Sequence, residues 1–203
     1  MTLRIGALVL AAGSSTRYGD RNKLIEMLEG KALVAHSVDA ALGAGLGPVQ
    51  VVTGANPEAV RQALGGREVS FVHHADHARG MGSSLAAGAR SIAAAEGLAV
   101  LLGDMPWVRA SHVQQVYETF AAQGASRRAQ LICLPTFGGQ RGHPVLFGSE
   151  HFPALRTLDG DTGARALVAS SDVVEVGMAD DAVLRDIDRG DDWPPGERPA
   201  QLQ

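Results

Sequence analysis

Short apolar runs that alternate with helical patterns constrain the fold of this chain more than any other feature. The apolar runs occupy residues 3–10, 49–53, 69–73 and 98–102. Patterns typical of helices occupy residues 33–44, 57–64, 83–95 and 110–122. Continuous apolar runs are typical of strands that are covered on both faces. The alternation therefore predicts βαβ units and an α/β fold, with a doubly wound, mostly parallel sheet in three layers.

The pattern changes after residue 130. A strand over residues 130–134, a glycine-rich turn over 137–142 and a strand over 144–147 predict an antiparallel return, and hence a mixed sheet. Short helices near 151–158, 163–169 and 180–187 and a strand over 172–176 complete the expected elements. We expect a single domain over residues 1–188. The polar, proline-containing segment 189–203 is predicted to be a flexible tail.

Composition limits the partners and the compartment. The 203 residues carry a net charge of −4, which argues against general nucleic-acid binding. The sequence lacks an 18-residue apolar run, so no membrane span is expected. A single cysteine, Cys133, excludes a disulfide within the chain and favours a reducing, cytoplasmic location. Arg4 followed by the apolar residues 5–12 resembles a signal peptide, but the run is short and supplies the first strand.

Glycine, small hydroxyl residues and cations follow the first apolar run. Gly13, Ser14, Ser15, Arg17 and Lys23 lie in this loop. Backbone amides near the glycine and the two cations could surround a triphosphate. The spacing matches neither a Walker A loop nor a G-x-G-x-x-G dinucleotide loop. The alternative is an ordinary surface turn with solvated cations.

Two aspartates are candidate metal ligands. Asp104 follows the apolar run 98–102, and ligands of open α/β sheets bind outside the carboxyl ends of the strands. Mg²⁺ takes one or two carboxylates together with substrate phosphates. Asp161 precedes a predicted helix and is the second candidate. Either residue could instead cap a helix or a turn.

Histidine and cysteine give weaker signals. His143 lies in a turn, where a structural hydrogen bond is the more common role. His74 and His77 have a usable zinc spacing, but no second cluster completes a tetrahedral site. Cys133 lies within an apolar run, which is typical of a buried, inert thiol.

Five motifs in order resemble the molybdenum-cofactor cytidylyltransferase group of the nucleotidyltransferases, which have a GT-A-like, Rossmann-like fold. The motifs are Leu10-Ala-Ala-Gly-Ser-Ser-Thr-Arg-Tyr-Gly19 with Lys23, Gly80-Met-Gly-Ser-Ser-Leu85, Leu102-Gly-Asp-Met-Pro106, Arg141-Gly-His-Pro-Val-Leu-Phe147 and Gly160-Asp-Thr-Gly-Ala-Arg165. The resemblance covers about residues 5–188. Asp186-Ile-Asp188 also fits the ending of this group.

The resemblance implies site residues. Lys23, Arg17 and Asp104 would be catalytic. Asp104 and Asp161 would bind Mg²⁺ or Mn²⁺. The nucleotide site would comprise Leu10, Ala11, Ala12, Gly13, Ser14, Ser15, Arg17, Lys23, Thr53, Gly54, Ala55, Gly80, Ser83, Ser84 and Asp104. The acceptor site would comprise Met105, Pro106, Arg141, His143 and Pro144. Ala11 and Ala12 before Gly13 look more like the cytidine-using members.

The implied reaction is transfer of CMP from CTP, or of a nucleotide from another NTP, to a phosphorylated acceptor such as the molybdopterin cofactor, with release of pyrophosphate. The partners would be these two substrates, with neither nucleic acid nor membrane, and a delivery partner among molybdoenzymes or their chaperones is left open. A sugar or polyol phosphate is the alternative acceptor. A non-catalytic carrier of a nucleotide or pterin is the alternative outside the enzymes.

Overall fold

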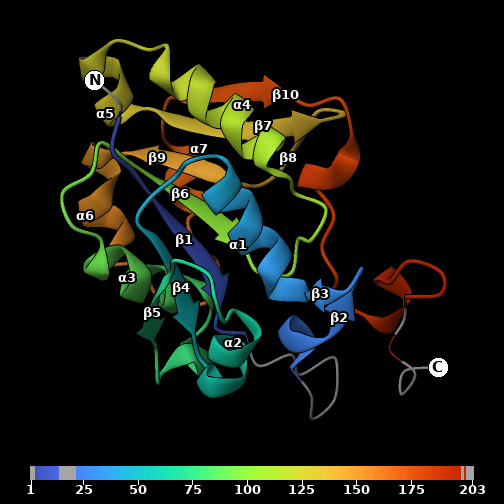
Figure 1. Cartoon of the computed structure of the whole chain (residues 1–203). Helices are drawn as coiled ribbons and strands as arrows, with labels where there is room; N and C mark the ends of the chain where they lie inside the picture. Colours follow the sequence, from blue (N-terminus) through green and yellow to red (C-terminus); the bar gives the residue numbers. More distant parts are fainter. Residues whose placement is uncertain (1–2, 14–21, 198, 200–203) are drawn as a thin grey trace.

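A single large sheet forms the centre of the molecule (Figure 1). The structure is a computed structural model that describes residues 3–13, 22–197 and 199. The sheet has eight strands in the order β10-β7-β9-β6-β1-β4-β5, with β8 paired to β7. They are β1 (Ile5–Ala11), β4 (Val49–Thr53), β5 (Ser70–His73), β6 (Gly97–Leu102), β7 (Ile132–Phe137), β8 (Gln140–Arg141), β9 (Val145–Gly148) and β10 (Val173–Gly177). Ser14, Ser15 and Arg17 lie outside the described residues.

The strand directions confirm a mostly parallel, mixed sheet. β1 pairs in parallel with both β4 and β6. β4 pairs in parallel with β5, and β10 pairs in parallel with β7. β9 runs antiparallel to both β6 and β7, as the break in the sequence pattern predicts. The carboxyl ends of β1, β4 and β6 therefore meet at one edge, where ligands of open α/β sheets bind.

Helices cover both faces of the sheet (Figure 1). They are α1 (Leu33–Gly43), α2 (Pro57–Ala63), α3 (Met81–Ser91), α4 (Ala110–Ala121), α5 (Ala125–Gln130), α6 (Phe152–Leu155) and α7 (Arg165–Ala169). Ala7 and Val9 of β1 pack in the core cluster that includes α1 and α4, and Leu8 packs in the cluster that includes α3 and α6. Because successive side chains alternate across a strand, this central strand is apolar throughout. The three-layer α/β prediction is confirmed.

Helix α3 begins at Met81, two residues before its predicted start at residue 83. Gly80, not Ser83 or Ser84, is the N-cap residue, and its φ of 115° lies in a region that side chains rarely adopt. The backbone N–H of Gly82 donates to Gly160 O at 2.7 Å, which satisfies one of the free donors of the first turn. The two serine hydroxyls donate to Gly80 O from within the helix. The helix also ends at Ser91, short of Ala95.

Two other segments differ from their expected boundaries. The predicted strand over 130–134 becomes helix α5 followed by β7, because Ala125–Gln130 forms a short polar helix that has no apolar stripe to signal it. Helix α2 ends at Ala63, one residue before its predicted end at 64, and Asn56 before it has a φ of 54° and makes no side-chain cap hydrogen bond.

The segment after residue 188 is packed in part against the domain. A short 3₁₀ helix, η6 (Gly190–Asp192), precedes Trp193, which is 5% exposed and belongs to the core cluster on the α1 side. The Asp192 carboxylate accepts hydrogen bonds from the backbone of Asp188 and Arg189. The first part of the predicted flexible tail, from residue 189 to Trp193, is therefore anchored by one large apolar side chain.

Candidate active site

Lys23 and Asp104 meet at the carboxyl edge of the central strands. Asp104 follows β6, and Lys23 begins the 3₁₀ helix η2 (Lys23–Ile25). The Asn22 side chain accepts a hydrogen bond from Leu24 N at 3.0 Å and so fixes the start of that helix. Lys23 Nζ then lies 2.8 Å from Asp104 Oδ2. Two residues that are 81 positions apart thus form one partly buried ion pair.

A third segment brings two more carboxylates to the pair. Lys23 Nζ also donates to Ile187 O at 2.7 Å and to Asp188 Oδ1 at 2.9 Å. The backbone N–H of Ile187 donates to Asp104 O at 2.9 Å, which holds this segment against the end of β6. The Arg185 guanidinium lies 4.0 Å from the centre of the Trp107 ring and joins the same two segments a second time.

Asp104, Asp186 and Asp188 form a group suited to a divalent cation. One carboxylate oxygen from each lies within 4.8 Å of the others. Carboxylate oxygens are the ligands that Mg²⁺ and Mn²⁺ prefer. Among the described residues, Asp161 does not belong to this group. We refer to the three aspartates below as the carboxylate cluster.

The charges of the cluster alter its ionisation. Burial, together with the charges of Asp104 and Asp188, raises the pKa of Asp186 above its ordinary value. Burial alone would lower the pKa of Lys23, but Asp104 and Asp188 raise it above the ordinary value. Lys23 is therefore cationic at neutral pH. Among the described residues, three aspartates lie close together beside the Lys23 ammonium, an arrangement in which a divalent cation would offset negative charge.

Asp161 lies elsewhere, at the start of α3. A Cβ added to Gly80 would collide with the Asp161 carboxylate and with the Gly160 backbone. This contact places Asp161 over the N-cap of α3 and explains why the position holds glycine. Its role as a metal ligand stays a prediction.

The predicted nucleotide residues divide into two sets, one at the ends of β1 and β4 and one at the start of α3. At the strand ends, Ala11 lies beside Thr53 in the sheet, and a Cβ on Gly54 would collide with Ala12 O and the His77 ring. The adjoining residues Leu10 and Gly13 are on the same edge, and Ala55 follows Gly54. His77 is therefore a neighbour of the nucleotide residues that could not be identified from the sequence. Its spacing from His74 is the one feature of the sequence that draws attention to it.

The two serines of α3 are directed into the protein. Ser83 is 6% exposed, and its hydroxyl donates to Gly80 O at 2.8 Å. Because that bond uses the hydroxyl proton, Ser83 Oγ accepts from His74 Nε2, 3.0 Å away. Ser84 is 5% exposed and also reaches Gly80 O. Both serines therefore shape the first turn of α3.

The predicted acceptor residues are also divided. His143 feels the charge of Asp104, but burial dominates and, with Arg165, lowers its pKa to about 4. Its imidazole is therefore neutral at neutral pH beside the carboxylate cluster. Arg141 donates to Glu175 Oε1 at 2.8 Å, on the neighbouring strand β10. Three others, Met105, Pro106 and Pro144, are buried.

The remaining chemical candidates are inert in this arrangement. Burial raises the pKa of the Cys133 thiol to about 12, so it is protonated at neutral pH. His74 and His77 belong to no metal-binding group of three among the described residues.

Within the part of the chain that the structure describes, no helix is both long enough and apolar enough to cross a membrane.

Comparison with known proteins identifies the family of this chain. The MobA-like NTP transferase domain family matches residues 7–176, and the chain belongs to this family. Rv0371c from Mycobacterium tuberculosis H37Rv is similar in structure, with a TM-score of 0.77 and 29% identity over 95% of this chain and 96% of that one. A manganese complex of Rv0371C has a TM-score of 0.68 and 28% identity over 86% of this chain and 88% of that one.

A curated relative matches only in part. The bifunctional protein GlmU of Syntrophomonas wolfei subsp. wolfei is 29% identical over 125 residues, which are 61% of this chain and 28% of that protein. The chain thus spans less than a third of the length of this relative. The family and the neighbours establish a nucleotidyltransferase fold and class.

Proposed function

We propose that this protein transfers CMP from CTP to a phosphorylated acceptor such as the molybdopterin cofactor, with release of pyrophosphate. The observation that carries the proposal is the meeting of Lys23 with the carboxylate cluster at the carboxyl edge of β6. Membership of an NTP transferase family supports the reaction class. The single, buried cysteine supports a cytoplasmic setting.

Asp104, Asp186 and Asp188 are the residues that would hold Mg²⁺ or Mn²⁺. When bound there, the cation would supply positive charge to the triphosphate and to the leaving pyrophosphate. Asp161 is a further candidate ligand, from the corner beside Gly80. Arg17 is a further candidate cation, although it lies outside the described residues.

The chemistry requires positioning more than proton transfer. An oxygen of the acceptor phosphate would attack the α-phosphorus of CTP while the bond to the pyrophosphate oxygen breaks. A phosphate monoester has a second pKa of about 6, so it is largely a dianion at neutral pH and needs no general base. Lys23 would hold the triphosphate and offset developing charge. His143, neutral beside Asp104, would contact the acceptor without adding charge.

One observation supports cytidine and leaves the acceptor to be found. Ala11 and Ala12 before Gly13 resemble the loop of cytidine-using nucleotidyltransferases. A sugar or polyol phosphate fits the same reaction. A carrier that only binds nucleotide or pterin has no need for three carboxylates around a lysine, and we therefore favour the enzyme.

Pyrophosphate release tests this proposal. The full chain would be assayed with Mg²⁺ or Mn²⁺, each of CTP, GTP, ATP and UTP, and molybdopterin or a sugar or polyol phosphate as acceptor. We expect turnover with CTP and one acceptor class. Thermal shifts with the four nucleotides and metal would give the base preference without an acceptor. Equal shifts for all four would overturn the cytidine assignment, and binding without turnover with any acceptor would favour the carrier.

A further inference from the structure

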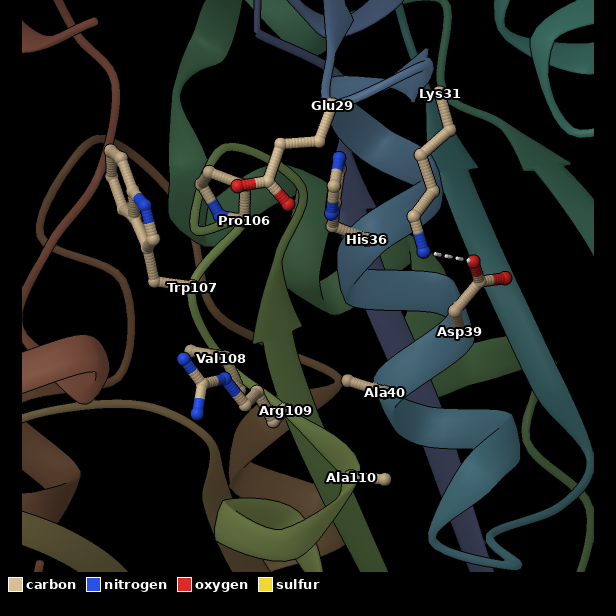
Figure 2. A pocket seen from close by; sticks show the side chains of 10 residues that line it. All are labelled: Glu29, Lys31, His36, Asp39, Ala40, Pro106, Trp107, Val108, Arg109 and Ala110. Atoms are coloured by element: carbon tan, nitrogen blue, oxygen red, sulfur yellow. Dashed lines mark hydrogen bonds and ion pairs between the residues drawn. The ribbon is translucent and has the colours of Figure 1, made fainter. Parts of the chain in front are cut away.

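A cavity of about 290 Å³ lies on the α1 side of the fold (Figure 2). It is lined by helix α1, by the hairpin of β2 (Met27–Leu28) and β3 (Lys31–Ala32), and by residues 106–110. This volume is at the lower end of the range for small-molecule sites, roughly 300–1,000 Å³. The cavity is open to solvent on one side, and its volume suits a ligand the size of an amino acid.

The wall nearest α1 carries a buried acceptor. His36 is 9% exposed, and its Nε2 lies 3.0 Å from Leu28 O. Because a carbonyl oxygen only accepts, Nε2 carries the proton. Burial lowers the pKa of His36, so the ring is neutral and Nδ1 has a free lone pair. No described residue donates a hydrogen bond to that nitrogen, and His36 lines the cavity.

Opposite charges extend from two sides of the cavity. Figure 2 shows the Glu29 carboxylate reaching in from the hairpin and the Arg109 guanidinium on the other side, beside Val108. Neither side chain forms an ion pair with another described side chain, whereas Asp39 in the same wall is already paired with Lys31 at 2.9 Å and Arg67 at 2.6 Å. The cavity therefore offers one acceptor side and one donor side.

Glu29 occupies a strained backbone position. Its φ is 49°, and it is followed by Gly30 with φ 79° in the two-residue turn of the hairpin. Such turns favour Asn, Asp or Gly at the first position, and another residue there is strained. A long carboxylate at this strained position is consistent with a use for the carboxylate that reaches into the cavity.

We propose that this cavity binds a zwitterion of the size of a free amino acid. Its ammonium group lies between the Glu29 carboxylate and His36 Nδ1, and its carboxylate faces Arg109. The apolar part of the ligand lies against Pro106 and Trp107. None of the cavity's lining residues belongs to the carboxylate cluster, but Pro106 is also a predicted acceptor residue and Trp107 contacts Arg185 beside the cluster.

Binding of the twenty standard amino acids to the full chain tests the proposal. Each would be screened by saturation-transfer NMR, and Kd would be measured by calorimetry. We expect at least one to bind. Glu29→Gln and Arg109→Gln should each weaken binding by about tenfold or more, since a hydrogen bond to a charged group contributes about 1.5–3 kcal/mol. The exposed Glu58→Gln and Arg4→Gln are matched controls that should leave Kd unchanged.

The contrary outcomes are distinct. Failure of all twenty to bind, or binding that neither cavity variant weakens, would overturn the proposal. Displacement by CTP would also overturn it, because it would place the amino acid in the nucleotide site. Melting curves of the variants check that they fold. Metal and CTP binding by the same variants report on the nucleotidyl-transfer centre independently, since none of the changed residues belongs to it.

Discussion

Asp104 and Asp161 are both aspartates at the end of a regular element, yet the fold gives them different surroundings. Asp104 joins Lys23, Asp186 and Asp188 in a charged cluster at the edge of β6. Asp161 lies over Gly80, where the backbone of α3 begins. The difference teaches that a carboxylate becomes a candidate metal ligand through the charges that other segments bring to it. The sequence position alone is ambiguous.

Loss of the Asp104 charge should have the largest effect. Asp104→Asn removes a carboxylate from the cluster without changing its shape, and we expect turnover to fall by roughly 10²–10³ or more. Asp161→Asn should lower turnover by much less. Steady-state pyrophosphate release measures both variants, and melting curves control for folding. Comparable losses in the two variants would remove the distinction between the two sites.

Gly80→Ala should be the most destabilising change at the Asp161 corner. The added Cβ meets the Gly160 backbone and Asp161, and the φ of 115° is strained for alanine. Gly66→Ala is the matched control, because its φ is 82° and nothing lies within 4 Å of the added Cβ. Strain alone costs on the order of 1–3 kcal/mol. Urea denaturation should show a larger loss for Gly80→Ala, and equal losses would mean that the contact with Asp161 is unimportant.

Asp186→Asn should weaken metal binding and yet stabilise the metal-free protein at pH 7. The pKa of Asp186 is raised in the folded state by burial and by Asp104 and Asp188. A carboxyl group whose pKa is higher in the folded than in the unfolded state lowers the free energy of unfolding at pH values above its folded pKa. This destabilisation disappears as the pH falls below the pKa of the unfolded state. The two free energies of unfolding should converge as the pH approaches 3.8, the ordinary value. Denaturation in EDTA across this range, with Asp76→Asn as control, measures the effect, and a less stable Asp186→Asn at pH 7 would contradict it.

The contact between Trp107 and Arg185 should have the smallest effect. It joins the segment after Asp104 to the segment before Asp186, and an exposed cation–π pair contributes about 0.5–1 kcal/mol. Trp107→Leu and Arg185→Gln should each weaken Mn²⁺ binding a few-fold, with Trp107→Phe restoring part of the loss. Arg61→Gln removes a similar pair with Phe71, which joins α2 to strand β5 and involves no segment that carries an aspartate of the cluster, and it should leave the Mn²⁺ affinity unchanged. An unchanged affinity in all of these variants would show that the contact does not position the carboxylates.

The first half of the fold could be predicted well because its signals are local. Residues such as Ala7, Leu8 and Val9 are apolar on both faces of the central strand, and helices separate each parallel strand from the next. The predicted boundaries were wrong where contacts with a distant segment of the chain determine them. Gly160 supplies an acceptor to the start of α3, and Trp193 anchors the end of the chain through burial that its proline-containing surroundings do not signal.

The candidate site could be predicted only in part. The ends of β1 and β6 indicated Lys23 and Asp104, and the structure brings them together. The sequence indicates no role in metal binding for Asp186 and Asp188, because the short helix predicted near 180–187 does not reveal which part of the sheet its end contacts. Long-range contacts, such as the hydrogen bond from Ile187 N to Asp104 O, determine that placement.

Mn²⁺ binding measured by electron paramagnetic resonance tests the carboxylate cluster most directly. Wild-type protein, Asp104→Asn and Asp161→Asn would be titrated with and without CTP. We predict one site in the wild type and in Asp161→Asn, and loss of that site in Asp104→Asn. Retention of Mn²⁺ by Asp104→Asn together with its loss in Asp161→Asn would contradict the account and move the metal to the corner beside Gly80.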